Sequence, residues 1–298
     1  MNKNHIGKIM FKNMDKGILR SSDMKQKKYQ VLYFIMVLIM ICYGLIVVIP
    51  SLWMILSGFK GVAEMYQKPT HFFPQQIHLS KLLDVWNQLS FYKYYINTAI
   101  MAIGAVIFDV VVNGFAGYVL SRLKPRGAKA VYWLVVLLML FPATMSTVPL
   151  YISFKNVGML NSYLPIWLMA ASNMFNIVLF KTSFDSISNS IVEAARIDGA
   201  SDLRIFFNII LPLSVPVIMT VSIFTFNGQF GNFFWPYLLI SDTEKMTLGI
   251  WLYKVKSSNL TMDYQMITML FAIVPQLVIF MLFSRYIIGG VNVGGVKG

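Results

Sequence analysis

Long apolar runs, separated by shorter polar segments, make up most of this chain of 298 residues. The first run, residues 31–57, has no charged side chain and exceeds the length of about 20 residues that a membrane-spanning helix needs. Similar runs along the chain predict five further spans. The six predicted spans are residues 31–57, 94–120, 130–151, 163–180, 213–238 and 264–284. The pattern therefore predicts an all-α polytopic membrane protein with six transmembrane helices.

The composition agrees with this prediction, because 57% of the residues are hydrophobic and 12% are charged. Soluble domains are typically about half apolar and about a quarter charged. We divide the chain into a basic N-terminal segment (1–30), a transmembrane domain (31–288) and a Gly-rich tail (289–298). The first apolar run is too long for the core of a cleaved signal peptide, so we expect it to remain as a span.

Basic residues are unevenly distributed along the chain, whose formal net charge is +13. Eight of the 25 Lys and Arg residues precede the first span. Such a cluster is typical of a cytoplasmic end held against anionic lipid, so we expect the lipid bilayer as its partner and no nucleic acid. If both termini are cytoplasmic, 17 of the 25 basic residues lie on the inner side. This bias predicts an N-in, C-in topology.

Residues that could carry catalysis or bind a metal are few. The single cysteine cannot form an intrachain disulfide, and the three histidines lie outside all six predicted spans without metal-ligand spacing. No P-loop pattern is present, so we expect no binding or hydrolysis of ATP by this chain. We predict no catalytic residue, no metal site and no cofactor, which argues against a membrane-embedded enzyme.

The polar segment between the fourth and fifth predicted spans contains signals for two short helices. Ser190 and Glu193 have the S-x-x-E spacing of a capping box, so the first helix should begin just after Ser190. Gly199 should end it, because glycine adopts left-handed backbone conformations at little cost. Ala194 and Ala195 would leave this helix a thin face that another protein could approach closely.

The second short helix should begin after Ser201, which is a suitable N-cap residue. It should give way to the next span at Pro212, which has no N–H to donate. Four residues at helical spacing are expected on its apolar face: Leu203, Phe206, Phe207 and Ile210.

The order of these residues resembles the EAA loop of permease subunits of binding-protein-dependent ABC importers. The family pattern is Glu-Ala-Ala, three residues, Gly, nine residues, then Ile-x-Leu-Pro. The matching positions in this chain are Glu193, Ala194, Ala195, Gly199, Ile209, Leu211 and Pro212. The resemblance extends over residues 32–298 and is closest to the maltose-type second permease of carbohydrate importers.

This resemblance implies a type I ABC importer permease fold with a cytoplasmic coupling loop at residues 188–212, named the EAA loop below. In the family, this loop docks in a cleft of the ATPase subunit and moves with it. The residues expected to couple to the ATPase are Glu193, Ala194, Ala195, Asp198, Gly199, Ile209, Leu211 and Pro212. For Glu193 two roles stay open, namely an ion pair with a basic group of the partner or capping of its own helix.

The same resemblance implies the partners and the place of the protein. The implied partners are a second homologous permease, two cytoplasmic ATPase subunits and an extracytoplasmic solute-binding protein, and the implied location is a bacterial or archaeal cell membrane. The implied function is ATP-driven import of a carbohydrate. Import of another solute, such as a glycerol phosphodiester, by the same class of transporter is the alternative. A purely structural membrane scaffold would not need the matched EAA spacing.

Polar side chains near the end of the fifth predicted span suit contact with sugar hydroxyls. These are Asn227, Gln229 and Asn232. Polar contact between helices is their alternative role. Residues 230–233 read Phe-Gly-Asn-Phe where carbohydrate permeases often have Trp-Asn-Asp/Glu-Phe, and this difference leaves the identity of the solute open.

Asp109 is the only charged residue inside a predicted span. Counted from Ser121 at ~1.5 Å per residue it lies roughly 18 Å into the bilayer, where an Asp costs about 2.5–3.5 kcal/mol. We expect it to be protonated, paired with the second permease, or exposed to a watery pathway. Asn113, four residues on, should hydrogen-bond with it or with a shared ligand. On the pathway hypothesis both residues meet sugar hydroxyls, and the alternative is a structural role between helices or subunits.

Overall fold

The structure, a computed structural model, describes residues 27–69, 71–256 and 260–291. Every regular element in these ranges is a helix, and no strand occurs within them. The predicted all-α class is therefore confirmed. Most of the predicted basic N-terminal segment and most of the Gly-rich tail lie outside the described residues.

Three helical segments are long and apolar enough to cross a membrane unaided: Lys27–Gly58, Phe91–Leu123 and Met262–Leu282. The first is helix α2, and the third is part of α17 (Met262–Val291). The second is a continuous path in which α-helices and π-helical turns alternate. Its parts are α5 (Phe91–Phe108), η3 (Asp109–Asn113), α6 (Gly114–Tyr118) and η4 (Val119–Leu123).

Three further apolar segments are bent helix pairs, so the described residues contain up to six spans if each pair counts as one. The first pair, α7 (Ala128–Leu138) with η5 (Ala143–Ser146) and α8 (Thr147–Asn156), is bent by 96°. The second, α9 (Leu164–Ala170) with α10 (Met174–Asp185), is bent by 47°. The third consists of α12 (Asp202–Ile205), η6 (Phe206–Ile210) and α13 (Leu211–Leu213), followed at 83° by α14 (Val215–Phe230).

Three predicted spans differ from the observed helices, and one of them, 163–180, is divided into α9 and α10 by the bend of 47°. The predicted span 130–151 is not one straight helix, because the chain breaks around Pro142, which cannot donate a backbone hydrogen bond. The predicted span 213–238 ends at Phe230, and α15 (Phe234–Leu239) is a separate short helix. Apolar composition continues through the breaks in these last two spans, so hydropathy alone does not reveal them.

The predicted outer loops also contain helices. Within residues 58–93 lie α3 (Val62–Met65) and α4 (Ser80–Gln88), and within 239–265 lie η7 (Thr243–Lys245) and α16 (Leu248–Lys256).

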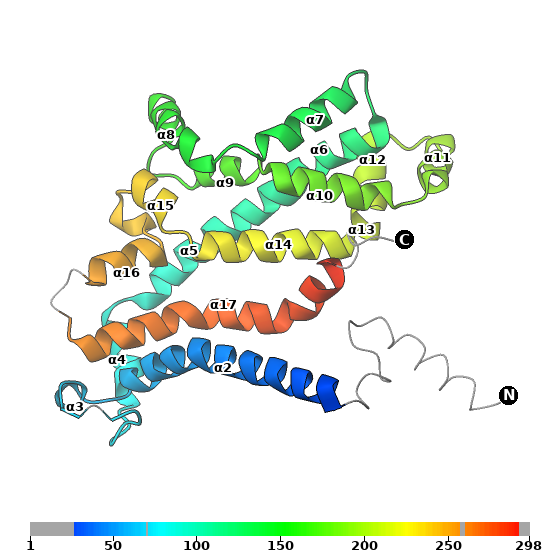
Figure 1. Cartoon of the computed structure of the whole chain (residues 1–298). Coiled ribbons are helices and arrows are strands. Elements are labelled where there is room, and N and C mark those ends of the chain that lie inside the picture. The colour runs from blue at the N-terminus through cyan, green and yellow to red at the C-terminus, as the bar shows by residue number, and fades with distance from the viewer. Residues whose placement is uncertain (1–26, 70, 257–259, 292–298) are drawn as a thin grey trace.

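The long helices pack side by side, with α2 against α17, α17 against α14, and α14 against α5, while α10 packs on α6 and α7 (Figure 1). At one end of this bundle lie α11 (Asn189–Ile197), α12 and α13. The start of α2, the end of α17 and the turn between η4 and α7 lie at the same end (Figure 1). Helices α3, α4, α15 and α16 lie at the opposite end. The described parts of the four segments predicted to be cytoplasmic therefore lie at one end of the molecule.

Two glycines allow close packing in this bundle. A Cβ added at Gly117 would lie 2.7 Å from the Cβ of Phe180, which shows how closely α6 and α10 approach. A Cβ at Gly104 would lie 2.2 Å from the indole of Trp167. That indole donates its N–H to the carbonyl of Met101 at 3.0 Å, so the position of α9 on α5 depends on the missing side chain.

Candidate functional site

The EAA loop is divided by a glycine turn at the end of α11. Gly199 has a φ of +78°, in the left-handed region that favours glycine. Its N–H donates to the carbonyl of Arg196, and the N–H of Ala200 donates to the carbonyl of Ala195, both at 3.0 Å. This pair of bonds is a Schellman motif, which satisfies the last carbonyls of α11. The predicted end of the first helix at Gly199 is confirmed.

The two helix starts of the loop are capped differently. Ser201 caps the second helix as predicted, because its Oγ accepts the N–H of Arg204 at 3.4 Å. The capping box predicted from Ser190 and Glu193 is wrong, since α11 begins one residue before Ser190 and has Ser188 at its N-cap. The hydroxyl oxygens of Ser188 and Ser190 lie 2.7 Å apart, so these two side chains pair with each other.

One face of α11 packs into the protein. Val192 and Ala195 are buried in a cluster that also contains Tyr118, Phe184 and Phe206. The small side chain of Ala195 lets the helix approach these aromatic rings closely. The expectation that both alanines of the motif face outward is therefore wrong for Ala195.

The other face of α11 and the turn after it are exposed. Glu193, Ala194, Asp198 and Gly199 all lie on the surface. Ile197 is 86% exposed, although it is a large apolar residue. The sequence analysis did not single out Ile197. The signal that could have found it is a large apolar residue two positions before Gly199, in an otherwise polar stretch of the helix. The structure thus presents one apolar side chain beside two carboxylates.

The second half of the loop is held by its apolar side chains. Ile205, Phe206 and Ile210 are fully buried, whereas Leu203 and Phe207 are about half exposed. The predicted apolar face is therefore wrong at Leu203 and Phe207. The π-helical turn η6 supplies the reason, because the five-residue spacing of a π-helix places Ile205 and Ile210 on one face.

The end of the motif leads into the next span. Ile209 and Leu211 are partly buried against the same cluster, and Pro212 is exposed within α13. The predicted boundary at Pro212 is shifted by two residues, since the chain turns by 83° at Ser214. Pro212 lies in the last turn of the continuous helical segment Asp202–Leu213, where it cannot donate a backbone hydrogen bond, just before the turn at Ser214.

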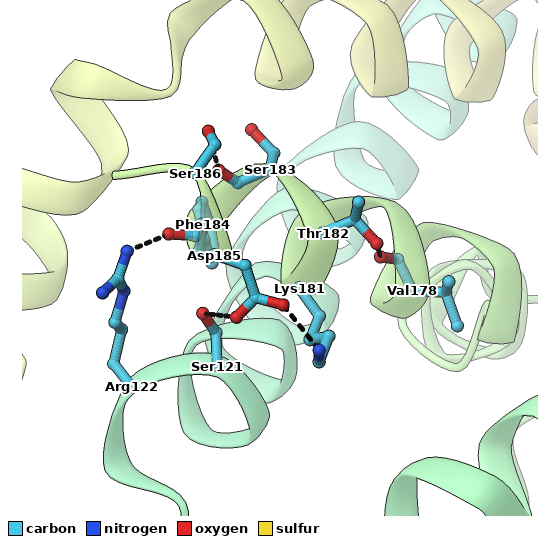
Figure 2. Close-up of polar contacts among 9 residues, drawn as sticks. All are labelled: Ser121, Arg122, Val178, Lys181, Thr182, Ser183, Phe184, Asp185 and Ser186. Atoms are coloured by element: carbon cyan, nitrogen blue, oxygen red, sulfur yellow. Dashed lines mark hydrogen bonds and ion pairs between the residues drawn. The ribbon is translucent and has the colours of Figure 1, made fainter. Parts of the chain in front are cut away.

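Arg122, at the end of the second span, holds the start of the EAA loop. Its guanidinium donates to the carbonyl oxygens of Phe184 and Ile187 and to Oδ1 of Asn189. Figure 2 shows the side chain reaching across to the end of α10. The last carbonyls of a helix have no partner within it and carry partial negative charge, so an arginine fork suits them well. In the sequence analysis, Arg122 counted only as one of the basic residues expected on the inner side.

A second set of contacts joins the same two elements. Asp185 accepts a hydrogen bond from the hydroxyl of Ser121 at 2.7 Å and forms an ion pair with Lys181 (Figure 2). The Lys181 ammonium lies 4.8 Å from the centre of the Tyr132 ring on α7. The ends of the second span, α7 and α10 are therefore connected where the EAA loop begins.

Asp109 lies in a buried polar knot that joins three helices. Its Oδ1 accepts from the amide of Asn113 at 2.6 Å, and its Oδ2 accepts from the amide of Asn176 at 2.7 Å and from the hydroxyl of Thr225. The amide of Asn113 also donates to the carbonyl of Ala170 at 2.8 Å. Since Asn176 lies on α10 and Thr225 on α14, the carboxylate connects the second span to both.

The burial of Asp109 can be compared with the three arrangements expected for it, which were protonation, pairing with the second permease, and exposure to a watery pathway. The side chain is 1% exposed, and that of Asn113 is fully buried. The predicted bond between them is present. The remaining partners come from within this chain, an arrangement that the sequence did not predict because Asn176 and Thr225 are distant along it.

The three polar residues at the end of α14 lie apart from this knot. Asn232 donates to the side-chain oxygen of Gln229 at 3.1 Å and accepts from the N–H of Trp235 at 3.4 Å. Oδ1 of Asn227 is buried without a hydrogen-bond partner among the described residues. Within those residues, no group of three or more His, Cys, Asp or Glu side chains could hold a metal ion.

Comparison with known proteins places these features in a family. The family described as “Binding-protein-dependent transport system inner membrane component” matches residues 113–292. The diacetylchitobiose uptake system permease protein NgcG of Streptomyces coelicolor is 30% identical over 261 residues, which cover 86% of each chain. The galactooligosaccharides transport system permease protein GanQ of Bacillus subtilis is 28% identical over 284 residues, covering 93% of this chain and 99% of that protein.

Solved structures share the fold. A chain of a bacterial ABC transporter involved in the import of the acidic polysaccharide alginate has a TM-score of 0.78 at 23% identity, covering 88% of this chain and 98% of its own. A chain of the alginate transporter in complex with a pentasaccharide-bound periplasmic protein has a TM-score of 0.60 at 15% identity, covering 89% and 95%. At these identities the likeness concerns the arrangement of the helices.

Proposed function

Because this chain belongs to the family of binding-protein-dependent transport system inner membrane components, we propose that it is one of two permease subunits of an ATP-driven carbohydrate importer. The chain is a transport component and not an enzyme, so ATP hydrolysis is assigned to two partner ATPase subunits. A second, homologous permease completes the pathway, and an extracytoplasmic solute-binding protein delivers the cargo. The assembly lies in a bacterial cell membrane with the EAA loop and both termini in the cytoplasm.

The two faces of α11 carry this proposal. Val192 and Ala195 anchor the helix to its own chain, while Glu193, Ala194 and Ile197 remain outside. An exposed isoleucine beside a carboxylate suits a partner that offers an apolar pocket with a basic rim. We assign this outer face to the cleft of the ATPase subunit.

Movement of α11 would then reach the membrane through Arg122. The arginine joins the start of the EAA loop to the end of the second span. Further along the same span, Asp109 joins it to α10 and α14. Coupling between distant sites travels through such contiguous packed and hydrogen-bonded elements. Asp109 and Asn113 are therefore assigned to positioning of helices and not to contact with the solute.

The carbohydrate cargo is supported by the relatives, which are named for diacetylchitobiose and galactooligosaccharide transport. None of these names favours a glycerol phosphodiester. Gln229 and Asn232 are partly exposed and lie at the end of α14 remote from the EAA loop. Together with Asn227 they are our candidates for contact with sugar hydroxyls on the outer side of the pathway.

The proposal is tested by reconstitution in liposomes. The complete assembly, with the second permease, ATPase and binding protein, should import labelled oligosaccharide when ATP is supplied. This chain alone should import none, and uptake by the lone chain would overturn the proposal. In the complete assembly, Ile197→Glu should reduce retention of the ATPase during purification, whereas Ile152→Glu on α8 should leave retention unchanged.

A further inference from the structure

A basic cavity lies beside the network of Figure 2, between the turn that follows η4, the start of α7 and the side of α10. Its volume is about 370 Å³, and its lining includes Lys124, Lys129, Lys181 and Tyr132. It lies at the same end of the molecule as the EAA loop (Figure 1). Arg122 and Asp109, to which coupling is assigned above, do not line this cavity.

The charge of the lining is strongly positive. Residues 121–129 contain four basic residues and no acidic one. Lys124 and Lys129 are exposed, and within the described part of the chain neither forms an ion pair. The carboxylate that faces this region is Asp185, which already accepts from Ser121 and Lys181. Two lysines therefore remain uncompensated around the cavity.

The backbone adds donors to these cations. The eleven-residue helix α7 begins at the cavity wall, and Gly127 and Ala128 belong to the lining. The N–H of Ala128 already donates to the carbonyl of Pro125 at 2.9 Å. The donors at the helix start are therefore the N–H groups that follow it, because the first N–H groups of a helix have no acceptor within it and carry partial positive charge. Lysine side chains and helix N–H groups together match the oxygens of a phosphate group.

The side chains next to the cavity indicate the source of that phosphate. Just beyond the cavity, Val131, Trp133 and Leu134 of α7 are 50%, 60% and 55% exposed. Tryptophan is enriched at the depth of the lipid headgroups, and the apolar side chains beside it suit acyl chains. The cavity thus lies where a polar turn meets a lipid-facing helix.

We propose that this cavity binds the phosphate-bearing headgroup of an anionic glycerophospholipid, whose acyl chains run along the exposed face of α7. Lys124, Lys129 and the start of α7 hold the phosphate oxygens. Lys181 is shared between this site and Asp185, so a bound phosphate competes for it. The lipid therefore acts on the same contacts that join α10 to the second span where the EAA loop begins.

The experiment is native mass spectrometry of the full chain in detergent, titrated with phosphatidylglycerol or phosphatidylcholine. The wild-type chain should retain phosphatidylglycerol in preference to phosphatidylcholine. Lys124→Gln and Lys129→Gln should each weaken this retention about tenfold, the effect of losing one hydrogen bond from a charged donor to the phosphate. Arg126→Gln removes the same charge from the same turn but outside the cavity lining, and it should leave retention unchanged.

Three results would overturn the proposal. Equal retention of the two lipids would show that the headgroup charge is not recognised. An equal loss in Arg126→Gln would replace the site by diffuse attraction between the turn and the membrane. Displacement of phosphatidylglycerol by millimolar inorganic phosphate, which then stays bound, would make the site one for a free anion. All three readouts are independent of transport, so the proposal can fail while the proposed function stands.

Discussion

Replacement of Arg122 by glutamine tests whether the second span and the EAA loop move as one unit. The arginine donates to two backbone carbonyls, those of Phe184 and Ile187, and to the side chain of Asn189. Glutamine is shorter, has one NH₂ group and carries no charge. At least one of the two carbonyls therefore loses its arginine donor in Arg122→Gln, while that of Phe184 still accepts from the N–H of Ile187 at 3.1 Å.

The size of the effect follows from the two carbonyl contacts, which are partly buried. Hydrogen bonds from a charged donor contribute about 1.5–3 kcal/mol each. The contact with exposed Asn189 is left out, because water replaces it. At the lower limit, the two carbonyl bonds stabilise the attachment of the loop by about 3 kcal/mol, which is more than a hundredfold in the equilibrium between attached and detached loop.

The assay is the coupling ratio of the reconstituted importer, meaning oligosaccharide imported per ATP hydrolysed. Arg122→Gln should assemble and hydrolyse ATP, while its coupling ratio falls about tenfold or more, because the ATPase then moves α11 without moving the second span. Arg122→Lys keeps the charge but not the planar fork of donors, so it should be intermediate. Arg126→Gln, in the same turn and exposed, is the control for lost charge.

An unchanged coupling ratio in Arg122→Gln would refute the reasoning, and so would an equal fall in Arg126→Gln. A loss of assembled complex that accounts for the whole loss of uptake would assign Arg122 to folding alone.

Two further predictions concern the polar knot and the glycine turn. Asp109→Leu should lower the yield and melting temperature of the chain, because it removes the carboxylate that accepts hydrogen bonds from Asn113, Asn176 and Thr225, at about 1–3 kcal/mol each. Asp109→Asn should lower them much less. A Leu variant that melts normally but does not transport would instead support contact with the solute. Gly199→Val should reduce ATPase retention and uptake, because a β-branched residue at a φ of +78° costs about 1–2 kcal/mol. No atom lies within 4 Å of a Cβ built there, so Gly199→Asn, which tolerates this conformation, should be nearly normal, and equal loss in both variants would show that backbone strain is not the cause.

Features that depend on neighbouring residues were predictable from the order of amino acids. The apolar runs predicted the membrane-spanning helices, since backbone N–H and C=O groups in lipid must be satisfied within a helix. The Gly199 turn and the Ser201 cap were predictable for a similar reason, because each is closed by hydrogen bonds within five residues. The EAA spacing is likewise local, and it predicted a coupling loop at residues 188–212.

The faces on which these helices meet were not predictable, because they depend on the packing of the whole bundle. Ala194 and Ala195 are adjacent, yet one is exposed and the other is buried against an aromatic cluster. Periodicity did not predict the 83° turn at Ser214 or the shifted face after the π-helical turn η6, because a short apolar segment offers similar burial on several faces.

The polar contacts show most clearly what the spacing of residues along the chain does not predict. Arg122 meets a carbonyl 62 positions away, and Asp109 meets partners 67 and 116 positions away. A charged residue in an apolar span indicates that a polar or charged partner must exist, because its burial is otherwise too costly. Which residue becomes that partner depends on how the whole helix bundle packs, and this information is not contained in the spacing of residues along the chain.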